Sequence, residues 1–356
     1  MPYPIITPSF FQELTDPKNP ENANLQYIIL NTPAAVEYAF PLNQEKVVRR
    51  LMQQKESLSF KMTPLKPEAE EEFAKKGAEI VEKFPILKHY WSMKTLTMNL
   101  LQDRRYSLDH RMWLLNYAYK TIQYIIENPD PNNKAQNDEQ RAEILDRNIE
   151  GFIQSMLREE NHDHVVEKYF ADIKPNTPYG IADGISMLRT FPETEETKKL
   201  LTIICKHAGI PKGADSFQYD EELHKKIKDS YEEMFAFKPV KEGETPAEDP
   251  EKIDRSYYME QIMVNYIWTY CFPYADISVD LWKNFVFLNT LYNALKVAVS
   301  CYIYGSKTPD EDFVFVITAF DTGLRSIKGN PLRMVVESES KAQLSNNGDM
   351  AILSIS

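Results

Sequence analysis

Glycine and cysteine are scarce in this chain of 356 residues, which contains 11 Gly and three Cys. Phosphate-binding loops and the turns of β-sandwiches depend on glycine, so their scarcity favours helices. The cysteines, Cys205, Cys271 and Cys301, lie far apart, are odd in number and form no Cys-x-x-Cys pair. These features exclude a disulfide-rich scaffold and fit a reducing cytoplasm.

Positively charged residues are also too few to balance the negative ones. The chain has 41 Lys and Arg against 53 Asp and Glu, which gives a formal net charge of -12. This balance argues against a nucleic-acid binder, whose affinity comes mostly from cations on phosphates. No basic segment followed by an apolar core opens the chain, so we expect no signal peptide. The longest apolar stretch, residues 281–304, is interrupted by Lys and Asn, which argues against a membrane span. We therefore predict a soluble cytoplasmic protein.

What the chain does contain is apolar residues at helical spacing over most of its length. With 43% hydrophobic residues it can bury a sizeable core. We predict an all-α fold, a multi-helix bundle of roughly eight to ten helices with minor or no β structure. The expected helices span about residues 33–54, 67–84, 85–102, 107–128, 142–170, 194–207, 219–235, 258–270, 278–304 and 308–329.

Two helices carry start signals. Ser107 is a suitable N-cap. Thr308 is expected to cap the last helix, with Pro309 in the first position and Asp310 and Glu311 completing a capping box. The helix at 278–304 is apolar on most of its circumference, which is typical of a central, buried helix.

Composition divides the chain into five regions. A stretch rich in Lys, Glu, Asp and Pro is the best candidate for an exposed linker. The predicted regions are 1–128, an N-terminal segment and helical bundle; 129–236, a middle helical region; 237–256, the linker or long loop; 257–330, apolar C-terminal helices; and 331–356, a polar tail.

Common catalytic motifs are missing from the sequence. Gly305-Ser306-Lys307-Thr308 resembles the end of a phosphate-binding loop, but Ser306 and Cys301 stand where that motif needs glycine. No Gly-x-Gly-x-x-Gly follows a strand, and no Gly-x-Ser-x-Gly is present. Each cysteine sits in an apolar helical pattern and is expected to be a small buried hydrophobe.

The run His162-Asp163-His164, preceded by Glu159 and Glu160, holds the densest set of potential metal ligands. On a helix Glu160 and His164 are one turn apart and could share an ion. Open metal sites usually draw ligands from more than one element, so we favour a solvated helix face and predict no metal site.

A polar junction, residues 101–111, separates two apolar helices. Arg104 and Arg111 could clamp a carboxylate or phosphate; alternatively, the arginines pair with Asp103 and Asp109 and cap the flanking helices. A second polar cluster lies on the apolar helix near 258–270 and consists of Glu260, Asn265 and Tyr266. A buried Glu260 would need a partner, for which an arginine of the junction is the obvious candidate.

Three stretches resemble the bacterial flagellin lysine-N-methylases. Residues 30–35, Leu-Asn-Thr-Pro-Ala-Ala, are similar to that family's Leu-Ser-Cys-Pro-Glu-Ala segment. Residues 101–111 resemble its Leu-Gln-x-Arg-x-x-x-Leu-x-x-Arg junction. Residues 260–267 with Phe272-Pro273 resemble its Glu-Asn-Leu-x-Val-x-Tyr-x-Phe run, which ends near Phe-Pro.

The resemblance implies methyl transfer to lysine side chains of a protein of the flagellin type, with S-adenosylmethionine as the methyl donor. A substrate lysine must lose a proton before it attacks a methyl group, and Glu260 and Asp103 are the candidates for the base or orienting group. The candidates for substrate or partner binding are Gln102, Arg104, Arg111, Asn265 and Tyr266.

The chain departs from the family in its cysteines. Family members carry a cysteine-rich N-terminal region understood to hold an iron–sulfur cluster, whereas here no Cys precedes Asn31 and Thr32 replaces the family's Cys. Such a cluster needs about four thiolates, so none is expected. An alternative is therefore a non-catalytic helical module that binds a protein and has lost the iron–sulfur centre. A third is a helical small-molecule enzyme that uses the Arg104/Arg111 clamp.

Overall fold

The computed structural model describes residues 42–53, 55, 85–132, 135–169, 177–210, 219–235, 255–269, 272–273 and 281–327. Over these residues it contains eleven α-helices, one 3-10 helix and no strand, which confirms the all-α prediction with slightly more helices than expected. The helices are α4 (Glu45–Gln53), η1 (Pro85–His89), α6 (Tyr90–Leu101), α7 (Leu108–Glu127), α8 (Asp138–Met156), α9 (Glu159–Tyr169), α10 (Thr177–Arg189), α11 (Glu195–His207), α12 (Glu221–Phe235), α13 (Tyr258–Thr269), α14 (Leu281–Ile303) and α15 (Pro309–Ser326). The predicted helix at 67–84, the 30–35 motif and the 331–356 tail lie outside the described residues.

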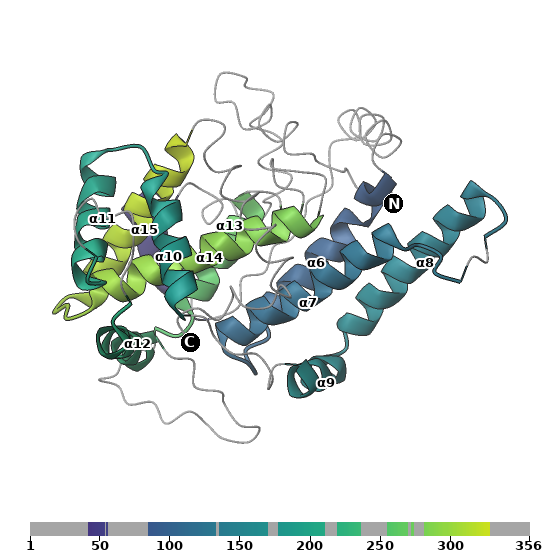
Figure 1. Ribbon diagram of the computed structural model, residues 1–356, viewed down its shortest axis with the longest axis horizontal. Coiled ribbons are helices and arrows are strands. Elements are labelled where there is room, and N and C mark those ends of the chain that lie inside the picture. The colour runs from purple at the N-terminus through teal and green to yellow at the C-terminus, as the bar shows by residue number, and fades with distance from the viewer. Residues whose placement is uncertain are drawn as a thin grey trace.

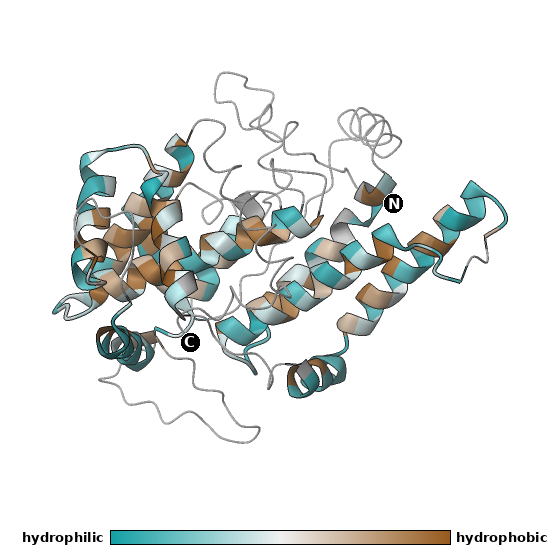
Figure 2. Cartoon of the chain, in the orientation of Figure 1, coloured by the Kyte–Doolittle hydropathy of each residue, from teal (hydrophilic) through white to brown (hydrophobic). Residues whose placement is uncertain are grey.

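Helix α14 is the centre of the fold. Helices α7, α10, α11, α12 and α15 pack around it (Figure 1). It is long and apolar enough to cross a membrane, but its apolar window is buried completely by these neighbours. Figure 2 shows the apolar residues gathered on α14 and the helices beside it. The prediction of a central, buried helix is confirmed.

Helices α6, α7 and α8 lie side by side as a second group (Figure 1). In α8 the buried residues Ile149, Ile153 and Met156 recur at three- and four-residue spacing and form one face, while most of the helix is polar. Because α7 contacts both α6 and α14, it joins this group to the core.

Helix α4 is tied to the C-terminal helices by polar contacts. The Asn43 backbone N–H donates to Asp321 Oδ2 at 2.9 Å, and Tyr257 Oη donates to the Met52 carbonyl at 2.9 Å. Arg49 forms an exposed ion pair with Glu311 on α15. These contacts bring the start of the described chain onto α13 and α15.

The two predicted helix starts have different outcomes. Ser107 caps α7 as expected, because its Oγ accepts from the His110 N–H. Thr308 precedes α15 with Pro309 in the first turn, but the predicted Thr308 capping box is wrong, since the Thr308 side chain makes no cap hydrogen bond. Ser306 instead ties the segment before α15 to its first turn, because its Oγ accepts from the Thr308 N–H at 2.9 Å and donates to Asp312 Oδ2.

The middle region differs from the sequence prediction in two places. The expected helix at 142–170 is two helices, α8 and α9, because Asn161 Nδ2 donates to the Ser155 carbonyl at 2.6 Å and so stabilises a turn at the end of α8. Helix α10 was not predicted at all. Its buried residues Ile181, Ile185 and Leu188 recur at helical spacing, which was the available signal in the sequence. Its contact with α14 uses Gly184, where an added Cβ would lie 2.7 Å from Val297 Cγ2.

Candidate functional site

The turn between α6 and α7 positions the polar junction. The Gln102 N–H donates to the Met98 carbonyl at 3.0 Å, ending α6, and the Tyr106 N–H donates to the Asp103 carbonyl at 3.2 Å. Ser107 then begins α7. This short turn therefore presents its charged side chains between two buried helices.

Two arginines of the junction bind the carboxylate of Glu260 on α13. Arg104 Nη2 donates to Glu260 Oε1 at 2.7 Å, and its Nε lies 3.1 and 3.0 Å from the two carboxylate oxygens. Arg111 Nη1 donates to Glu260 Oε2 at 2.6 Å and to the Leu101 carbonyl at 2.8 Å. The side chains of Glu260 and Arg111 are fully buried, whereas 30% of the Arg104 side chain is exposed. Glu260 thus has the partner that its burial requires.

The arginine clamp therefore holds a carboxylate of its own chain. Each oxygen of Glu260 already accepts hydrogen bonds from two nitrogen atoms. A carboxylate in this setting is suited to orient Arg104 and Arg111 and to hold α13 against the junction.

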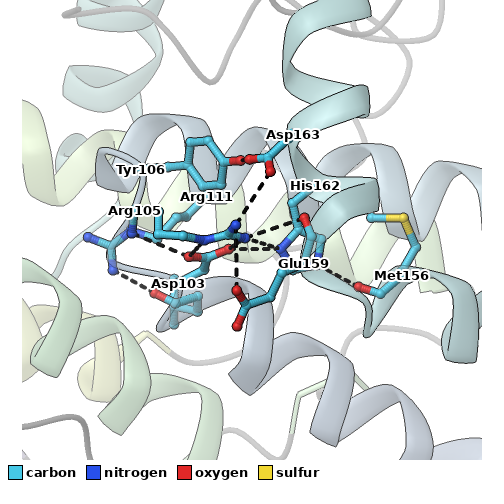
Figure 3. A network of polar contacts seen from close by, with 9 residues as sticks. Asp103, Arg105, Tyr106, Arg111, Met156, Glu159, His162 and Asp163 are labelled. Carbon is cyan, nitrogen blue, oxygen red and sulfur yellow. Dashed lines mark hydrogen bonds and ion pairs between the residues drawn. The ribbon is translucent and has the colours of Figure 1, made fainter. Parts of the chain in front are cut away.

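Asp103 is the centre of a second network, shown in Figure 3. Arg105 Nε donates to Asp103 Oδ1 at 2.9 Å, and Arg105 Nη2 donates to Oδ2 at 2.7 Å. His162 Nδ1 lies 2.8 Å from the same Oδ2. Burial opposes ionisation of Asp103, but the hydrogen bonds from Arg105 and His162 outweigh it and hold the pKa of Asp103 well below its usual range. Asp103 is therefore a fixed anion.

His162 links this network to the end of α8. Its Nε2 lies 2.5 Å from the Met156 carbonyl, while Nδ1 faces Asp103 (Figure 3). A carbonyl oxygen only accepts hydrogen bonds, so Nε2 is placed to donate to Met156, while Nδ1 faces both the Asp103 carboxylate and Arg105 Nη2, 3.4 Å away. Glu160 and His164 are exposed. Over the described residues, no group of three or more His, Cys, Asp or Glu is arranged to hold a metal ion.

The structure brings some of the predicted site residues together and separates others. Arg104 and Arg111 meet at Glu260, and Asp103 is in the same turn but binds Arg105 and His162. Gln102 is half-buried at the end of α6. Asn265 and Tyr266 follow Glu260 on α13 and are buried in the core.

A third polar cluster was missed by sequence reasoning. Lys296 Nζ on α14 donates to both carboxylate oxygens of Asp109, at 2.9 and 2.7 Å, and Tyr292 Oη donates to Oδ1 at 2.7 Å. The Tyr231 ring centroid lies 5.8 Å from Lys296 Nζ. Asp109 therefore pairs with a lysine, and the expected pairing with an arginine is wrong. The available signal was a tyrosine and a lysine four residues apart on a largely apolar helix.

Comparison with known proteins gives one match. Residues 94–331, roughly two thirds of the chain, match the family model of the FliB lysine N-methylase C-terminal domain. The matched region runs from within α6 to beyond α15 and includes all three polar clusters. No curated protein and no solved structure matches the chain.

Proposed function

The chain belongs to the FliB lysine N-methylase family, and from this we propose that it transfers methyl groups to lysine side chains of a protein, with flagellin as the first substrate to test. The observation that carries the proposal is the family match over residues 94–331. A net charge of -12 supports it, because an acidic protein attracts a lysine-bearing partner. We place the reaction in the cytoplasm, in keeping with the three dispersed cysteines.

The chain's thiols do not fit an iron–sulfur cluster. Such clusters need about four cysteine thiolates, and the sequence has three cysteines. Cys301 on α14 is fully buried, and burial raises its pKa to about 12, which favours the neutral thiol over a metal-binding thiolate. No step of the proposed reaction uses a cluster.

We propose S-adenosylmethionine as the methyl donor, which would supply an electrophilic methyl group. A nucleoside of this kind needs polar partners in the fold. Asn289 and Thr290 on α14 do not meet that need, because both side chains are fully buried with no accessible surface, although their polar atoms have no hydrogen-bond partner in the described part of the chain.

The α6–α7 junction is the proposed region for substrate contact. Arg104 is partly exposed and Gln102 is half-buried, so both are reachable from outside, whereas Arg111 supports them from within. Asn265 and Tyr266 are further candidates for binding, and both lie in the interior. We propose that Glu260 and Asp103 orient other side chains and do not act as the base, which needs a free lone pair. The oxygens of Glu260 already bind Arg111, and those of Asp103 bind Arg105 and His162.

The test is methyl transfer from isotope-labelled S-adenosylmethionine to purified flagellin. We expect label on lysine side chains, located by peptide mass spectrometry. Arg104→Gln should raise KM for flagellin more than it lowers kcat, because it alters the exposed part of the junction. The proposal is wrong if the intact protein transfers no methyl group to flagellin or to other lysine-rich proteins.

A second candidate function is a non-catalytic module that binds a protein. It is favoured because arginines of the chain itself already bind both candidate carboxylates, Glu260 and Asp103. In that case the protein would copurify with a partner, Arg104→Gln would weaken the complex, and the partner's lysines would remain unmodified.

A further inference from the structure

A serine and a histidine form a hydrogen-bonded pair at the start of α7. Ser107 Oγ lies 2.6 Å from His110 Nδ1, and it also accepts from the His110 backbone N–H at 3.3 Å. Both residues are half-buried, so part of each is accessible from outside the protein. A hydroxyl within hydrogen-bond reach of an imidazole is an arrangement that enzymes use to move protons.

Capping of α7 explains only one of the two contacts. An N-cap hydroxyl accepts from a backbone N–H in the first turn, as Ser107 does. The second contact joins the hydroxyl to the ring. In the neutral imidazole that carries its hydrogen on Nε2, the Ser107 O–H donates to His110 Nδ1. A hydroxyl has one donor and two lone pairs, so these two bonds leave one lone pair of Ser107 Oγ for a further donor.

The surroundings of His110 favour the neutral ring. Burial lowers the pKa of His110 below its usual value, and the charge of the neighbouring Asp109 opposes this only in part. That charge is itself balanced by Lys296, whose Nζ donates to both Asp109 oxygens. The ring of Tyr106 also faces His110, with centroids 6.4 Å apart. A neutral imidazole at pH 7 is able to accept a proton.

The carboxylates of the junction are less suited to accept that proton. Arginines hold both oxygens of Glu260, and the pKa of Asp103 lies well below its usual range. Asp109 is bound by Lys296. The Nδ1 atom of His110, in contrast, contacts a neutral hydroxyl.

We propose that Ser107 and His110 take the proton from the substrate lysine. The lysine ammonium donates to the remaining lone pair of Ser107 Oγ. As that proton passes to Oγ, the hydroxyl proton passes to His110 Nδ1, and the N–H bonding pair stays on the lysine nitrogen. The products are a neutral amine, an intact serine and an imidazolium, which releases its proton to water because His110 is partly exposed. This inference rests on the proposed function, because it takes lysine as the substrate.

Ser107→Asn and His110→Gln test the pair in the full chain. Asparagine caps a helix as well as serine does, so Ser107→Asn keeps α7 capped and removes the hydroxyl. We expect each variant to lower kcat for flagellin methylation about 100-fold or more, since general acid–base catalysis contributes at least that much. The KM for flagellin and the melting temperature should stay those of the parent protein.

The pH profile separates a proton acceptor from a structural residue. In the parent protein kcat should fall as the pH drops through the pKa of His110, because an imidazolium cannot accept a proton. His110→Gln should abolish this fall. His164→Gln, at an exposed position of α9, is the matched control and should change neither kcat nor its pH profile.

An NMR titration of the histidines gives a readout that needs no methyl transfer. We expect His110 to titrate below the ordinary value of 6.5, and we expect Ser107→Asn to change both its pKa and the chemical shift of Nδ1. A pKa above 6.5, or no response to Ser107→Asn, would overturn the inference.

The outcomes distinguish the proton pathway from the activity. If the parent protein methylates flagellin and either variant retains the parent's kcat, the pathway is wrong and the proposed function stands. If Ser107→Asn lowers kcat only as far as it lowers the folded fraction, Ser107 is a cap alone and the inference falls. If the parent protein methylates no lysine, the proposed function falls, and the NMR titration alone decides whether the pair is a proton acceptor.

Discussion

Arg111 donates a hydrogen bond of 2.6 Å to Glu260, and both side chains are completely buried. The two residues are 149 positions apart in the sequence, so this bond joins α7 to α13 across the interior. Arg111 also donates to the Leu101 carbonyl at the end of α6. One guanidinium group therefore connects three helices beneath the polar junction.

Removing the charge of Glu260 should be strongly destabilising. Glu260→Gln leaves the Arg111 cation buried without its counter-ion, and breaking a buried pair from one side costs about 3–5 kcal/mol. We expect a loss of this size in the free energy of unfolding, measured by urea denaturation with an unchanged m-value.

An exposed ion pair provides the control for Glu260→Gln. Glu222 and Lys226 are paired one turn apart on the surface of α12, so Glu222→Gln should not change stability measurably. Equal effects of the two substitutions would show that the buried pair has no special role.

Asp103 should make stability depend on pH in the acid range. Its pKa in the folded protein lies below the unfolded value of about 3.9, because Arg105 and His162 stabilise the anion. The stabilisation is therefore fully present above about pH 4 and is lost as the pH falls below that value. The difference in unfolding free energy between the parent protein and Asp103→Asn should shrink between about pH 5 and pH 2.

The exposed Glu143 on α8 serves as the comparison for Asp103. Glu143→Gln should follow the parent protein across the same range of pH. A constant difference between the parent and Asp103→Asn would contradict the role assigned to the Asp103 anion.

Loss of His162 should loosen the turn between α8 and α9. The ring contacts the Met156 carbonyl and the Asp103 carboxylate, so His162→Ala removes both connections from a fully buried position. We expect faster amide hydrogen exchange in residues 155–163 and a lower melting temperature. His164→Ala, at an exposed position of the same helix, should change neither.

Two glycines should respond to alanine in opposite directions. At Gly184 an added Cβ would lie 2.7 Å from Val297 Cγ2 and 3.3 Å from the Ala294 backbone, so Gly184→Ala should destabilise the protein by about 1–3 kcal/mol. At Gly151 nothing lies within 4 Å, and Gly151→Ala should stabilise α8 by about 0.5–1 kcal/mol. Thermal denaturation measures both, and similar shifts for the two variants would argue against the close contact of α10 with α14.

The helix positions could be predicted from the sequence where the signal depends only on neighbouring residues. Ser107 caps α7 because a hydroxyl before an apolar helix can bond its first turn whatever the surroundings. The break between α8 and α9 could not be predicted, because it depends on contacts of Asn161 and His162 at the end of α8. Helix α10 was missed although Ile181, Ile185 and Leu188 follow the helical period, and only the structure shows how closely its Gly184 approaches α14.

The site was predictable in part. A buried Glu260 demanded a cation, and the nearby arginines were the natural candidates, so the pair could be anticipated from chemistry. The contacts of Asp103 with His162 and of Asp109 with Lys296 could not, since several partners of equal charge were available along the chain.

The sequence by itself determined the helical class, the buried place of α14 and the family, because apolar periodicity, cap residues and ordered motifs are properties of neighbouring residues. Only the tertiary structure decided which charges meet and which polar atoms are left unpaired. A buried ion needs a partner but does not specify one, so the choice depends on how the helices pack. The arginine clamp closed on Glu260 and the unpaired amide of Asn289 are both results of that packing.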